Sequence, residues 1–159
     1  MELVENPRQL DLATKDNRHI NNRIGINGRN SQQISKFIGF PHKFPNVVMR
    51  SENTDQYNCH GLVFASRRTN IDDSNEVKKI LDNDEYKEIE PHKVLPGDII
   101  IYYAEDGDAE HSGIVISKPD PTFYIPRIIS KWGQLEEYIH MANECNYNFS
   151  NIKYYRLII

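Results

Sequence analysis

Residues 57–65 read Tyr57-Asn58-Cys59-His60-Gly61-Leu62-Val63-Phe64-Ala65, and they place a cysteine between a polar run and an apolar run. The apolar spacing predicts a buried helix over residues 59–68 that begins at or next to Cys59. The first amides of a helix lack partners and carry the positive end of its dipole. Both effects lower the pKa of a cysteine from its free value of about 8.5. The stretch therefore predicts a nucleophilic thiolate.

The composition is that of one polar but globular domain. The chain has 159 residues and a net charge of -4, which gives it no general attraction to nucleic acid or to an anionic membrane. Nine Tyr and six Phe argue against disorder. The start of the chain has no pattern of a signal peptide, and no run approaches the roughly 20 apolar residues that span a bilayer. We expect a single domain over residues 1–159 in the cytoplasm, or one delivered by a phage or a signal-independent secretion system.

The order of elements indicates the fold class. A cap at Asp72-Asp73-Ser74 predicts a second helix, buried through Val77, Ile80 and Leu81. Beyond it the pattern becomes that of strands, which we expect at residues 86–89, 99–103, 111–117, within 125–132, and at 152–157. Residues 1–50 are weakly patterned, and we interpret them as an N-terminal arm that packs on the core. Helices followed by an antiparallel meander predict an α+β fold.

Cys59 and His111 combine a nucleophile with a base. A cysteine attacks as the thiolate, so it needs a base within about 3 Å, and imidazole is the usual one. His111 opens a predicted strand, and a helix packed on a sheet edge can bring the two side chains together. The alternative is a cysteine buried only for packing. Cys59, His111 and His140 could form a three-ligand zinc set, but the chain has no Cys-x-x-Cys or His-x-x-x-His pair, so we expect neither zinc nor another cofactor.

Three motifs resemble those of the papain-like cysteine hydrolases, in the group of NlpC-type peptidases and CHAP amidases. Residues 58–63, Asn-Cys-His-Gly-Leu-Val, are similar to the Asp-Cys-Ser-Gly-Leu-Val of the nucleophile. Residues 95–100, Leu-Pro-Gly-Asp-Ile-Ile, match the Pro-Gly-Asp turn before the first core strand. Residues 111–115, His-Ser-Gly-Ile-Val, match the His-Val-Gly-Ile strand of the base. The resemblance covers about residues 55–132 and implies a papain-like fold, in which a nucleophile helix packs on an antiparallel sheet.

The resemblance also implies a reaction, the thiol-dependent hydrolysis of an amide in a peptide or a peptidoglycan stem. Cys59 would be the nucleophile and His111 the general base and acid. The backbone N–H of Cys59 would contribute to the oxyanion hole, with Tyr57 or His60 beside it. The chain departs from the family at Asn58, where an acidic residue is usual, and at His60, where a serine is usual. Both departures leave the oxyanion surroundings and the substrate preference open.

The residue that orients the imidazole of His111 is the least determined part of the prediction. The family places a polar residue on the strand after the base, and here that strand reads Ile-Ile-Ser-Lys-Trp-Gly-Gln over residues 128–134. Lys131 has no acceptor, whereas Ser130 and Gln134 have one. We favour His140, because a turn at Gly133 can fold it back toward the site. On the same strand, Trp132 is expected in the core or in the wall of the cleft.

Two other functions remain open from the sequence. An acyl or amide transferase would use the same Cys59–His111 pair with an amine or lipid in place of water. The permuted relatives that do this place the histidine before the cysteine, so the order here argues against it. A domain that has lost catalysis would keep the fold and bind a peptide or a protein partner.

Overall fold

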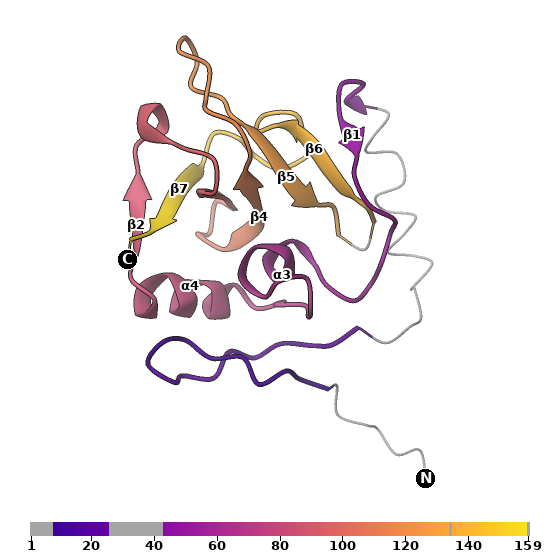
Figure 1. The fold of residues 1–159 in the computed structure, drawn as a ribbon, viewed down its shortest axis with the longest axis vertical. Coiled ribbons are helices and arrows are strands. Elements are labelled where there is room, and N and C mark those ends of the chain that lie inside the picture. The colour runs from indigo at the N-terminus through magenta and orange to yellow at the C-terminus, as the bar shows by residue number, and fades with distance from the viewer. Residues whose placement is uncertain (1–7, 26–42, 134, 159) are drawn as a thin grey trace.

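The computed structural model describes residues 8–25, 43–133 and 135–158 (Figure 1). Its centre is one antiparallel sheet of seven strands, in the order β1-β6-β5-β4-β3-β7-β2. The strands are β1 (Val48–Met49), β2 (Tyr86–Ile89), β3 (Ile99–Tyr103), β4 (Ala109–Val115), β5 (Arg127–Lys131), β6 (Glu137–Met141) and β7 (Ile152–Leu157). The helices are α3 (Cys59–Phe64) and α4 (Ser74–Asn83), with a 3-10 turn η1 (Pro91–Lys93). The predicted α+β class is confirmed.

Strands β3 to β6 form a meander, and β7 returns to the open side of β3. The turn into β3 depends on Gly97, whose φ of 96° lies in the left-handed region that glycine tolerates best. The carboxylate of Asp98 accepts from the N–H of Leu95 at 2.8 Å and closes this turn. Because β3 has a partner on each side, its run of apolar, β-branched residues is buried, as the sequence predicted.

Each face of the sheet has its own apolar cluster. On the face that α3 and α4 cover, Ile71 and Val77 pack with Ile99 and Ile101 of β3 (Figure 1). On the opposite face, Tyr102 packs with residues of β5 and with the segment that follows β6. Successive residues of β3 thus serve the two clusters alternately, which is the period of a strand.

Residues 8–25 run along α4 and α3 on the side away from the sheet (Figure 1). The side chain of Ile20 is buried among the apolar residues of α4. The N–H of Asn21 donates to the carboxylate of Glu76 at 2.8 Å, and Arg23 forms an isolated bridge with Asn70. These contacts fix the segment beneath the two helices.

Helix α3 is shorter than predicted, because it ends at Phe64 instead of continuing to residue 68. Ser66 and Arg67 have φ values of 51° and 64°, so the chain turns back on the helix. A Cβ added to Gly61 would lie only 1.8 Å from the carbonyl oxygen of Thr69, which shows how closely the returning chain approaches. Tertiary packing therefore ends the helix before its apolar periodicity does.

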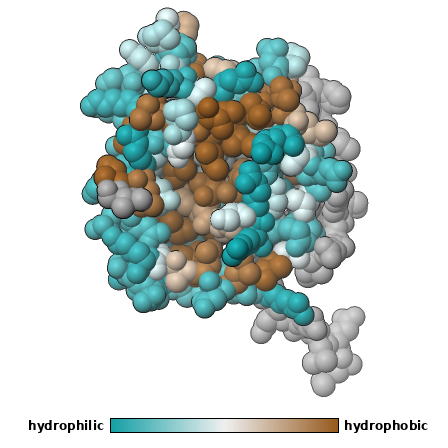
Figure 2. Space-filling model, in the orientation of Figure 1, coloured by the Kyte–Doolittle hydropathy of each residue, from teal (hydrophilic) through white to brown (hydrophobic). Residues whose placement is uncertain are grey.

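The surface is mixed in character. Figure 2 shows apolar side chains gathered over the middle of the face seen in Figure 1, with hydrophilic side chains around its margin. Among the described residues, Phe123, in the connection between β4 and β5, is the most exposed large apolar residue at 75%. Within the described residues, no helix has the length and apolar character needed to cross a membrane.

Candidate active site

Cys59 is the first residue of α3, and Asn58 caps the helix. The side-chain oxygen of Asn58 accepts from the N–H of Gly61 at 2.9 Å and from the N–H of Ile71 at 3.1 Å. Its amide nitrogen donates to the carbonyl of Ile71 at 2.9 Å. An aspartate could accept the first two bonds but could not donate the third. Because residue 58 is an asparagine and not an aspartate, its side chain bonds both backbone groups of Ile71 and holds that residue at the start of the helix.

His60 connects α3 to β4. Its Nε2 donates to the carbonyl of Ala109 at 2.9 Å, and its Nδ1 lies 2.8 Å from the hydroxyl of Ser112. Ser112 occupies a position where the related motif has valine, so two departures from the family pattern contact each other. Burial lowers the pKa of His60, but the interactions with Cys59, the carbonyl of Ala109 and Asp72 together outweigh it, and the pKa is raised.

His111 is brought to the site by an irregularity in β4. It pairs with Tyr102, whereas Tyr103 pairs with Ala109, so Glu110 is an extra residue directly before the histidine. Such β-bulges re-aim the side chains beside them. The imidazole is fully buried and stacks on the ring of Tyr147, with centroids 3.8 Å apart and planes within 5°. Neither ring nitrogen has a hydrogen-bond partner within the described residues.

The thiol of Cys59 is close enough to the imidazoles of His60 and His111 for both to affect its ionisation. Burial favours the neutral thiol and would raise the pKa of Cys59. The charges of His60 and His111 act in the opposite direction and outweigh burial, so the pKa of the Cys59 thiol lies well below its usual range. No hydrogen bond of standard geometry joins His111 to the sulfur, and the effect of this imidazole rests on its charge and proximity. The two free cysteines therefore differ, because burial raises the pKa of Cys145.

Tyr57 belongs to a buried polar network beside the thiol. Its hydroxyl donates to the carboxylate of Glu137, which also accepts from Arg67 at 2.7 Å. Burial, together with that hydrogen bond, raises the pKa of Tyr57 to about 12. The hydroxyl is thus committed to Glu137, and the structure gives no support to Tyr57 as an oxyanion donor.

Lys131 is a second buried cation on this side of the sheet. Its Nζ donates to the carbonyl of Gly133 at 2.6 Å and lies 5.1 Å from the centroid of the Tyr57 ring. Burial lowers the pKa of Lys131 to about 8, and the negative charge of Cys59 opposes this shift. The lysine therefore adds positive potential to the surroundings of the thiol.

His140 and Ser130 bond each other instead of His111. The Nδ1 of His140 donates to the carbonyl of Met141 at 2.8 Å, and its Nε2 accepts from the hydroxyl of Ser130 at 2.7 Å. Burial lowers the pKa of His140 to about 4, so the ring is neutral at physiological pH. The structure thus lacks the predicted hydrogen bond from His140, or from Ser130, to His111. Gln134, the other candidate, lies outside the described residues.

Trp132 is a core residue, which corrects its placement in the wall of the cleft. Its side chain is 1% exposed and packs at 4.4 Å, centroid to centroid, against the ring of Tyr138. Its indole nitrogen donates to the hydroxyl of Ser130 at 3.1 Å. Trp132 follows β5 directly and packs in the apolar cluster on the face opposite α3.

A cleft of about 570 Å³ opens beside the thiol. Cys59 and His60 line it together with residues from the start of α4 and from the start of β4. Among the described residues, no three His, Cys, Asp or Glu side chains are grouped as they would be around a metal ion, and this includes Cys59, His111 and His140. The cleft therefore reaches Cys59 and His60, whereas His111 is fully buried and does not line it.

Comparison of the chain with models of protein families, with curated proteins and with solved structures finds no match. The function is accordingly argued from the geometry around Cys59. His60 lines the cleft, where the sequence predicted it, but its contact with Ser112 was not expected. Tyr147 carried no signal, because it lies outside the three motifs.

Proposed function

We propose that this protein is a thiol-dependent hydrolase that cleaves an amide bond through an acyl-enzyme on Cys59. One observation carries the proposal: a buried thiol whose pKa is lowered by two imidazoles, one of which has no other partner. A cysteine buried for packing alone would have a raised pKa, as Cys145 does. Burial alone would raise the pKa of Cys59 too, so the two imidazoles determine whether this thiol is ionised.

The unpaired imidazole of His111 supports a chemical role. Buried polar groups in proteins almost always have hydrogen-bond partners, and the exceptions cluster where a group has a redox or catalytic task. An imidazolium N–H beside a thiolate would meet that requirement through the sulfur. Stacking on Tyr147 holds the ring without using either nitrogen, so both remain available for proton transfer.

The proposed reaction follows the sequence of a cysteine hydrolase. The sulfur of Cys59 attacks the carbonyl carbon, and the oxyanion forms near the backbone N–H of the same residue. His111 gives its proton to the amine, the C–N bond breaks, and a thioester remains. Water then loses a proton to His111 and attacks the thioester, which releases the acid and restores the thiol. His60 keeps its bonds to β4 and adds positive charge beside the sulfur.

We assign the substrate to peptides or peptidoglycan stems and the fold to the papain-like type. The support is the order of the three motifs, together with an antiparallel sheet that carries His111 next to a helix that begins at Cys59. Asn58, His60 and the partners of His140 differ from what the family leads us to expect.

The test needs no knowledge of the natural substrate. The protein is mixed with p-nitrophenyl acetate, a small activated ester, and its adducts are followed by mass spectrometry. We expect an acetyl group that appears on Cys59 and then turns over, with Cys145 as an internal reference. His111→Ala should slow both steps, and Cys59→Ser should abolish the adduct. Equal acetylation of the two cysteines would contradict the proposal.

The same assay separates hydrolysis from transfer. Addition of methylamine during turnover leaves acetate as the product of a hydrolase, whereas a transferase yields N-methylacetamide. We expect acetate, because the open cleft at Cys59 admits water. A domain that only binds peptides would show neither product and no preference for Cys59.

A further inference from the structure

The cleft beside Cys59 is lined by negative charge. Apart from His60, the charged residues that line it are Asp72, Asp73, Asp108 and Glu110, and within the described residues no Lys or Arg lines it. All four carboxylates belong to exposed residues. A cleft with walls of one sign concentrates the field and raises the local concentration of ligands of opposite sign.

Two of these carboxylates already have structural tasks. Asp72 forms an ion pair with Arg23 at 2.9 Å. Asp73 caps α4 by accepting from the N–H of Asn75 at 2.8 Å. Asp108 and Glu110 flank Ala109 at the start of β4, close in sequence to His111. They are therefore the carboxylates best placed to act on a bound substrate.

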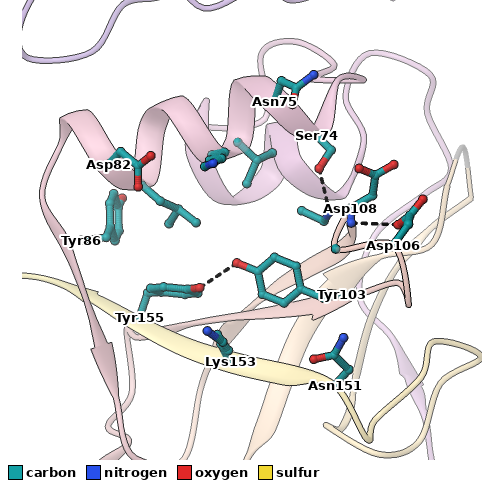
Figure 3. Close-up of a pocket in the computed structure, with 15 residues that line it drawn as sticks. Ser74, Asn75, Asp82, Tyr86, Tyr103, Asp106, Asp108, Asn151, Lys153 and Tyr155 are labelled. Atoms are coloured by element: carbon teal, nitrogen blue, oxygen red, sulfur yellow. Dashed lines mark hydrogen bonds between the residues drawn. The ribbon is translucent and has the colours of Figure 1, made fainter.

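A second cavity of about 580 Å³ adjoins the first, since Ser74, Asn75, Asp108 and Ala109 line both. Figure 3 shows this groove between α4 and the sheet. Its floor carries the rings of Tyr103 and Tyr155, whose hydroxyls are 2.7 Å apart. Asp106 and Asp108 lie at the end next to Ser74.

This groove suits an apolar group of a substrate whose positive charge lies at the end nearest the thiol. Tyrosine rings pack against methylene groups and attract cations through their faces. Lys78 and Lys153 also line the groove, and Lys153 pairs with Glu88 at 3.5 Å. The end nearest the thiol, where Asp106 and Asp108 lie, is thus the acidic end of the groove.

The cleft also borders the thiol of Cys59. The imidazole of His111 is fully buried, has two unpaired nitrogens, and acts on the thiol of Cys59, which itself lines the cleft. The acidic wall therefore borders a reactive group and not merely a solvated surface.

We propose that the cleft selects substrates that carry a basic group, such as a lysine or arginine side chain or a free amine, next to the scissile amide on the side of α4. Asp108 and Glu110 attract the charge, and the adjoining tyrosine groove takes an apolar group of the substrate that lies beyond it. The proposal rests on the proposed function, because it treats Cys59 as the nucleophile.

The experiment compares three methanethiosulfonate reagents of similar size on the intact protein: the ethyl, the trimethylammonium-ethyl and the sulfonatoethyl compound. The rate of modification of Cys59 by each reagent is divided by its rate with the urea-unfolded protein. We expect the cationic reagent to be favoured over the anionic one by about tenfold, the lower part of the range for electrostatic focusing. The preference should shrink as salt is added.

Asp108→Asn and Glu110→Gln should each reduce the preference, and Asp16→Asn, on an exposed residue far along the chain, should leave it unchanged. Asp108→Asn and Glu110→Gln are tested separately, so that the comparison still holds if one of them fails to fold. Equal relative rates for the three reagents, with a fast reaction at Cys59, would overturn the charge selectivity alone. Failure of the neutral reagent to modify Cys59 faster than the unfolded chain would overturn the proposed function and this inference with it.

Discussion

Substitution of Gly61 by alanine tests whether packing or helix propensity governs the nucleophile helix. Gly61 is the third residue of α3, and glycine costs about 1 kcal/mol relative to alanine in a helix interior. Propensity alone therefore predicts that Gly61→Ala stabilises the protein. The structure predicts the opposite, because the new Cβ would lie 1.8 Å from the carbonyl oxygen of Thr69.

The size of the effect follows from the nature of the obstacle. Real Cβ atoms do not approach closer than 3.0 Å, so the helix and residue 69 must separate by about 1.2 Å. The obstructing atom belongs to the backbone and cannot rotate away. Overpacking costs typically about 1–3 kcal/mol and sometimes more. We expect a net loss of about 3 kcal/mol in the free energy of unfolding, after the gain in propensity.

Urea unfolding followed by the fluorescence of Trp132 measures this loss, because the chain has one tryptophan and it is buried. Gly107→Ala is the control: its φ is 91°, and a Cβ there would meet no atom within 4 Å. Only backbone strain of about 1–2 kcal/mol is expected in the control. A Gly61→Ala variant as stable as the native protein would refute the close approach of the chain to α3.

Three further predictions concern the network around the site. Glu137→Gln should cost about 2 kcal/mol in urea unfolding, because a buried carboxylate that accepts from Arg67 and Tyr57 becomes neutral, and an unchanged midpoint would contradict this. Burial raises the pKa of Glu137 but these two bonds outweigh it, so its folded-state pKa is lowered. The ionised Glu137 therefore stabilises the protein above the unfolded-state pKa of about 4.3, and this stabilisation is lost as the pH falls through the folded-state pKa. The free energy of unfolding of the native protein should fall more steeply in acid than that of Glu137→Gln. Ser112→Ala should lower the free energy of unfolding by about 1–2 kcal/mol, because the buried Nδ1 of His60 loses its hydrogen-bond partner. An unchanged thermal unfolding midpoint would contradict this hydrogen bond.

The elements with a strong local pattern were predictable from the sequence. Strands β2, β3 and β7 were expected with the bounds that the structure shows, and α4 was expected from its cap at Asp73. Strand β6 was missed because Glu137 and His140 interrupt its apolar pattern, although both are buried. Their burial depends on partners far along the chain, which no local pattern encodes.

The candidate site, too, was only partly predictable from the sequence. The sequence places a cysteine at a helix start and a histidine on a strand, and the structure has both. The contact of His60 with Ser112 was not predicted, because the local pattern of α3 does not show which of its side chains reach β4. His140 was favoured from a turn, but its ring is taken by Ser130 and Met141, which lie beside it on the same sheet.

The central claim is that two imidazoles make Cys59 a thiolate although it is buried. An NMR titration of the Cβ resonance of Cys59, in protein labelled at cysteine, measures its ionisation directly. The account predicts a thiolate at neutral pH, with a pKa well below the free value of about 8.5 that rises when His111 is replaced by glutamine. A thiol that titrates at or above about 8.5, as burial alone requires, would contradict it.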